Sequence, residues 1–130
     1  MYTDILFLAG RLIFGGFFIM MGVTHGMKLG QMAGYAASKK VPLSSLAVLG
    51  TGLLFLSGGL GIVFGVFVPW AVAAIVLNLA GISVMMHPFW SVRDPQQRMM
   101  EQTQFLKNAA LAGAALTLLS VPEPWAYSLF

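Results

Sequence analysis

The stretch ISVMMHPFW, residues 82–90, gives the clearest indication of the fold. An apolar run ends there in a histidine, a proline and two aromatic rings. A transmembrane helix typically meets water in this way, because amphipathic rings lie at the level of the lipid headgroups and proline cannot extend the hydrogen-bond ladder. The stretch therefore predicts the end of a membrane-spanning helix.

The composition of the chain agrees with this prediction. Its 130 residues are 58% hydrophobic and 8% charged, whereas soluble domains carry about 25% charged residues. The absence of cysteine excludes disulfides and thiolate-bound zinc or iron–sulfur clusters. The net charge is +3, but the cations form no basic stripe, so no nucleic-acid partner is expected. We expect one membrane domain over residues 1–130.

Four apolar segments indicate four membrane crossings. They lie at about residues 5–27, 46–67, 70–90 and 105–121. About 20 helical residues cross a hydrocarbon core of about 30 Å, and short connections join antiparallel neighbours. The expected fold is all-α, an integral membrane four-helix transmembrane bundle with mostly antiparallel neighbouring helices.

The polar connections predict the orientation. An even number of crossings places both termini on one side, and most of the lysines and arginines fall in residues 28–45 and 91–104. The positive-inside rule then puts these two loops in the cytoplasm and the termini outside, in a multi-pass protein of the cell membrane. Within the first loop, residues 29–38 are expected to form a short interfacial helix.

Small and polar residues inside the segments predict helix contacts. Gly22, Gly26 and Gly30 repeat every four residues, a spacing that lets another helix approach closely. Asn78 is the one strongly polar residue inside the third segment, and we expect it to make an interhelical hydrogen bond.

Several motifs, in their order along the chain, resemble the DoxX family of small four-helix membrane proteins. They are Arg11-Leu12, Gly34-Tyr35 with Val41-Pro42, Ser57-Gly58-Gly59, His87-Pro88-Phe89-Trp90 and Phe105-Leu106-Lys107-Asn108. The resemblance implies a four-helix membrane bundle. It also implies a link to quinone-coupled sulfur oxidation or to redox partners, with other subunits present. Family members often carry a glutamate just before the glycine pair of the second span, where this sequence has Phe55.

One polar cluster is expected at the loop end of the bundle. Because successive spans cross the membrane in opposite directions, the ends of spans one and three and the start of span four share one membrane depth. The residues gathered there would be His25, Lys28, His87, Gln104, Lys107 and Asn108. A quinone headgroup needs hydrogen-bond donors for two carbonyls. His87, Lys107 and Asn108 could donate, and Phe89 and Trp90 could wall the site. In the alternative interpretation these residues only mark the water boundary.

Two metal-containing ligands are weaker alternatives. Methionines near His25 and His87 could bind Cu(I) through thioether and imidazole groups, although methionine also commonly fills apolar gaps. The two histidines could instead be the axial ligands of a haem. Arg11 is expected to pair with Asp4 or Glu123, to reach a lipid phosphate, or to bind an anionic substrate.

Three function classes remain open. The first is an accessory or scaffold subunit of a quinone-linked membrane redox complex, with the lipid bilayer and other membrane subunits, or a second copy of the chain, as partners. The second is a subunit of a quinone-linked oxidoreductase of the thiosulfate:quinone type, which the resemblance suggests. The third is a small-molecule permease. The sequence leaves open whether the protein is an enzyme.

Overall fold

A computed structural model describes residues 2–129, and it is helical with no strand in that range. The five α-helices are α1 (Tyr2–Met27), α2 (Leu29–Ser38), α3 (Ser44–Phe64), α4 (Val68–Met86) and α5 (Pro95–Thr117). Two 3₁₀ turns follow α4 and α5, namely η1 (Phe89–Ser91) and η2 (Leu118–Ser120). The predicted all-α class and the short helix at residues 29–38 are confirmed.

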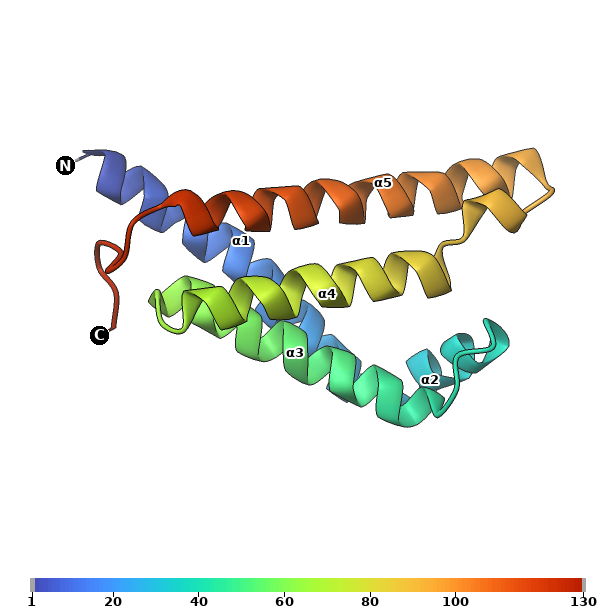
Figure 1. The fold of residues 1–130 in the computed structure, drawn as a ribbon. Helices are drawn as coiled ribbons and strands as arrows, with labels where there is room; N and C mark the ends of the chain where they lie inside the picture. The colour runs from blue at the N-terminus through green and yellow to red at the C-terminus, as the bar shows by residue number, and fades with distance from the viewer. Residues whose placement is uncertain (1, 130) are drawn as a thin grey trace.

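Consecutive long helices run antiparallel. Figure 1 shows both termini and the α3–α4 turn at one end, and α2 with the α4–α5 connection at the other. In order, α1 packs along α3, α3 along α4, and α4 along α5. By contrast, α1 and α5 do not pack along each other, so the ring of helices is not closed.

Three of these helices are long and apolar enough to cross a membrane. They are α1, α3 and the stretch Val68–Ser91 that contains α4. Large apolar side chains such as Ile13 and Leu53, which are 77% and 57% exposed, cover their outer faces, as expected for surfaces that face lipid chains. The chain is therefore a helical membrane protein, and the fourth crossing by α5 stays a prediction.

The start of α5 corrects the predicted loop 91–104. The Asp94 side chain accepts a hydrogen bond from the Gln97 backbone N–H at 3.1 Å, and Pro95 occupies the first turn. An aspartate cap followed by proline is a favourable helix start. The helix therefore begins ten residues before the expected span at 105, and its first half is polar.

Glycines set the contact between α1 and α3. A Cβ atom at Gly59 would lie 2.6 Å from the Gly15 carbonyl oxygen, and one at Gly22 would lie 2.6 Å from the Gly52 carbonyl oxygen. The two backbones thus approach each other at two points seven residues apart on each helix, which is possible only without side chains. Gly58, the neighbour of Gly59, faces Ala71 and Ile75 of α4 instead.

The predicted stripe Gly22–Gly26–Gly30 is wrong in part. Gly22 is in the contact with α3, but a Cβ atom at Gly26 or Gly30 would meet nothing within 4 Å. The rotation of α1 places Gly22 on the same face as Gly15 and leaves Gly26 facing outward, while Gly30 belongs to α2.

Arg11 does not reach the lipid headgroups. Its side chain is only 1% exposed, and Nε and Nη2 donate hydrogen bonds to the carbonyl oxygens of Ile62 and Val63 at 3.2 and 2.9 Å. These carbonyls belong to the last turn of α3, where helical partners are missing and the helix dipole favours a cation. The expected pairing with Asp4 or Glu123 is absent among residues 2–129.

The same guanidinium holds the C-terminal tail. Nη1 of Arg11 donates to the Ala126 carbonyl oxygen, and the Trp125 ring lies 5.2 Å from the guanidinium carbon, within the range of a cation–π contact. The Leu129 backbone N–H also donates to the Phe64 carbonyl at 2.8 Å. Arg11 therefore has a structural role that joins α1, the end of α3 and the tail.

We predict that Gly59→Ala weakens the α1–α3 contact. The added methyl would lie 2.6 and 2.8 Å from backbone atoms of Gly15 and Ile19, so the helices must separate, at a cost of about 1–3 kcal/mol of unfolding free energy. SDS-induced unfolding in detergent micelles measures this. Gly26→Ala is the matched control, and equal stability of the two variants would contradict the proposed contact.

We predict that Arg11→Met destabilises the protein and releases its tail. Three carbonyl oxygens lose their donor, which should cost about 3 kcal/mol, and the bond after Tyr127 should become a faster site of chymotryptic cleavage. Arg93→Met, at an exposed position, is the control. A tail as resistant to protease as in the unchanged protein would show that Arg11 does not hold it.

Candidate functional site

A cavity of about 670 Å³ lies toward the end of the bundle that carries α2. All five α-helices contribute to its walls. Its apolar lining includes Phe17, Phe55, Val48, Leu79 and Ile82. The volume is in the range of small-molecule sites, which are mostly apolar with a few polar groups.

The six residues of the predicted polar cluster all line this cavity. They are His25, Lys28, His87, Gln104, Lys107 and Asn108. The structure therefore brings together side chains from the end of α1, the end of α4 and the middle of α5. Ligand binding by these residues stays a prediction.

His25 is held rigidly against α3. Its ring Nδ1 lies 2.7 Å from the Met21 carbonyl oxygen, and its ring packs edge-on against Phe55 with centroids 5.8 Å apart. Its Cβ lies where a side chain at Gly52 would be, 2.7 Å from an added Cβ. The glycine at position 52 thus makes room for this histidine, which is 5% exposed.

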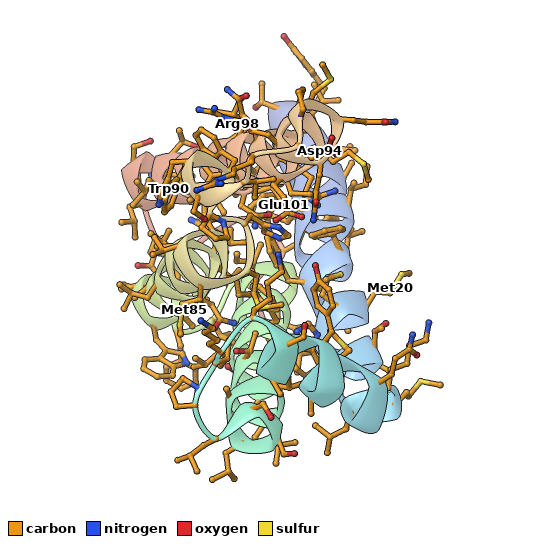
Figure 2. The ribbon with its side chains drawn as sticks, turned by 90° about the vertical axis from the view of Figure 1, so that its right-hand side faces the viewer. Met20, Met85, Trp90, Asp94, Arg98 and Glu101 are labelled. Carbon is orange, nitrogen blue, oxygen red and sulfur yellow. The ribbon has the colours of Figure 1, made fainter. Side chains whose placement is uncertain are left out.

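His87 is tied to α5 and to the segment after α2. Its Nδ1 lies 3.0 Å from Glu101 Oε2, and the same oxygen lies 3.8 Å from Lys39 Nζ. In Figure 2, which looks onto this end of the bundle, Glu101 lies near the centre of the view, whereas Met20 extends outward from α1. Glu101 therefore links three segments beside the cavity.

Sequence reasoning missed Glu101 because it assigned residues 91–104 to a loop. On the helix that actually forms, Glu101 precedes Gln104 by three residues, and Gln104 precedes Lys107 and Asn108 by three and four. Residues at these spacings share one helix face. The aspartate–proline start at Asp94 was the signal that could have placed Glu101 on that face.

The polar face of α5 leaves one amide free for a ligand. Lys107 Nζ donates to Gln104 Oε1 at 2.8 Å. Asn108 is 7% exposed, and among the residues that the structure describes its side chain has no hydrogen-bond partner. No buried side-chain nitrogen or oxygen in residues 2–129 lacks a partner, so the Asn108 amide is accessible from the cavity.

Phe89 and Trp90, the predicted walls of the site, lie outside the cavity. They are not among the residues that line the cavity, and their rings pack edge-on against each other and against Phe105, with centroids 5.4–5.7 Å apart. The 3₁₀ turn after Pro88 directs both rings toward α5. They therefore fix α5 to the end of α4, and the expected wall role passes to Phe17, Tyr35 and Phe55.

Asn78 makes the predicted interhelical bond. Its Nδ2 donates to the Thr51 carbonyl oxygen of α3 at 2.8 Å. Both residues also line the cavity, so this bond fixes the α3–α4 wall. Arg11 borders a separate, smaller hollow of about 200 Å³ with Phe7, Phe14 and Leu118.

Copper and haem binding stay untested predictions. Met21, Met32, Met85 and Met86 line the cavity with both histidines, while Met20, Met27, Met99 and Met100 are at least 64% exposed. Within residues 2–129, no three histidine or carboxylate side chains gather as a metal site.

Comparison with known proteins identifies the family. No curated protein and no solved structure matches the chain. The DoxX family model matches residues 6–88, a range that covers most of α1, all of α2 to α4, and both histidines of the cavity. The chain belongs to the DoxX family of proteins.

Proposed function

We propose that this DoxX protein is a membrane subunit that binds a quinone in the cavity and serves as an accessory or scaffold component of a quinone-linked redox complex. The observation that supports the proposal is the composition of the cavity. Hydrogen-bonding side chains from several helices line a mostly apolar space of about 670 Å³. A quinone has the same division, with a polar ring and an apolar chain.

The residues present suit a quinone ring. Its two carbonyl oxygens accept hydrogen bonds, and the free amide of Asn108 and the ammonium groups of Lys28 and Lys107 can donate them. The aromatic rings of Phe17 and Phe55 line the same space and can pack against the ring of the ligand.

A catalytic role is the second candidate. His87 lines the cavity and is hydrogen-bonded to Glu101 behind it, and such a pair can hold a proton close to a ligand. In that case the chain is a subunit of a quinone-linked oxidoreductase. Quinone reduction by the isolated protein with thiosulfate as the electron donor favours this role, while co-purification with a larger electron-transfer assembly without such activity favours the accessory role.

The distribution of charge supports the orientation that the sequence predicts, with the loops 28–45 and 91–104 in the cytoplasm. Lys28, Lys39 and Lys40 lie around α2, and Arg93 and Arg98 lie around the start of α5, which is the opposite end from both termini (Figure 1). With α5 as a fourth crossing, the positive-inside rule places this end in the cytoplasm.

We predict that Asn108→Ala weakens quinone binding. Loss of one amide donor should raise the Kd of an oxidised decyl-benzoquinone about two- to twelve-fold, measured by titration of the purified protein in detergent. Gln102→Ala, on the exposed face of the same helix, should leave the Kd unchanged. Equal affinity of the Asn108 variant and the unchanged protein would remove the amide from the site.

We predict that α5 crosses the membrane. The chain lacks cysteine, so the single variants Lys40→Cys, Arg98→Cys and Glu123→Cys can be labelled with an impermeant maleimide on intact cells. Only Glu123→Cys should react before the cells are permeabilised. Labelling of Arg98→Cys and Glu123→Cys from the same side would show that α5 does not cross.

A further inference from the structure

The two histidines of the cavity share one chemical feature. In each, Nδ1 faces an oxygen that can only accept a hydrogen bond: the Met21 carbonyl at 2.7 Å for His25, and the Glu101 carboxylate at 3.0 Å for His87. Each Nδ1 must therefore carry the hydrogen. A neutral imidazole has a single N–H, so Nε2 of each neutral ring carries a lone pair and acts as an acceptor.

These acceptor nitrogens are available to a ligand. Both residues line the cavity, and Nε2 of neither ring has a partner among the described residues. His25 is 5% exposed, yet no buried side-chain nitrogen in residues 2–129 is left unpaired. Its Nε2 must therefore be part of the small accessible area of the residue.

Hydrogen-bond acceptors such as these Nε2 atoms distinguish the two redox forms of a quinone. The oxygens of a quinone accept hydrogen bonds and cannot donate, whereas the hydroxyl groups of a quinol do both. Asn108, Lys28 and Lys107 can donate to either form. An acceptor such as His25 Nε2 has a partner only in the quinol, and beside a quinone carbonyl it stays unpaired, which is unfavourable in an apolar space.

We propose that the cavity selects the reduced, dihydroxy form of its ligand, with His25 and His87 accepting hydrogen bonds from the hydroxyl groups. This rests on the proposed quinone-binding function. Glu101 is then a positioning residue, because its carboxylate fixes the tautomer of His87. A neutral His87 accepts, which revises the donor role that the sequence suggested for it.

Binding of both redox forms tests the proposal. The Kd values of decyl-benzoquinone and of decyl-benzoquinol are measured anaerobically with the full chain in detergent, in alkaline buffer that keeps imidazole neutral. The quinol should bind more tightly, by about two- to twelve-fold for each hydrogen bond to a histidine. His25→Leu and His87→Leu should each reduce this preference, while Gln102→Ala should preserve it.

Glu101→Gln provides a readout that a merely structural role would not give. The carboxamide can donate to Nδ1, which allows His87 Nε2 to carry the hydrogen. This variant should lose quinol affinity while it keeps or gains quinone affinity. A variant that loses both affinities equally would show that Glu101 does not act through the tautomer.

The outcomes separate the inference from the proposed function. Equal affinity for the two forms, or a quinol preference that both histidine variants retain, would overturn the inference and leave quinone binding in place. Failure of both forms to bind the unchanged protein would overturn both. Because His25 is buried, thermal unfolding of each variant is measured, and His87→Leu at the more exposed position decides the result if His25→Leu does not fold.

Discussion

The α1 and α3 backbones lie in direct contact, and this contact fixes the positions of the other helices and of the cavity. Gly15 and Gly22 lie against Gly59 and Gly52, so the two helices are in backbone contact where side chains would hold them apart. In a bilayer there is little hydrophobic force between helices, and such close packing is a main source of their association. The same contact brings His25 over Gly52, and so places one histidine of the cavity.

The position of α1 also explains why there is a cavity. Since α1 lies against α3, and α5 packs along α4, the first and last helices do not close on each other. The space that remains toward the α2 end is lined by all five α-helices. At the opposite end, Arg11 binds carbonyls in the last turn of α3 and the tail at Ala126. That end is fixed by hydrogen bonds and has the smaller hollow of about 200 Å³, whereas the larger cavity lies toward α2.

The charged groups of the two ends therefore have different roles. Arg11 uses three donors on backbone carbonyls and is 1% exposed, which leaves it little access to any ligand. Glu101 is joined to His87 and Lys39 beside the cavity. Its carboxylate can therefore determine whether Nε2 of His87 accepts or donates a hydrogen bond. A buried cation at a helix end stabilises the fold, whereas a carboxylate–imidazole pair beside a cavity can take part in binding.

The membrane class, the helical fold, the short connection between the second and third spans and the end of α4 before Pro88 could be predicted from the sequence, because apolar length and proline geometry act locally. The sequence also predicted that the six polar residues of the cavity lie close together. Successive spans run in opposite directions, so the end of one span and the start of the next lie at the same membrane depth. Only the tertiary structure decided which glycines pair, that Phe89 and Trp90 pack on Phe105, and that Arg11 and Glu101 have their observed partners. The reason is that a membrane helix is apolar on both its lipid face and its packed face, so its pattern does not reveal its rotation.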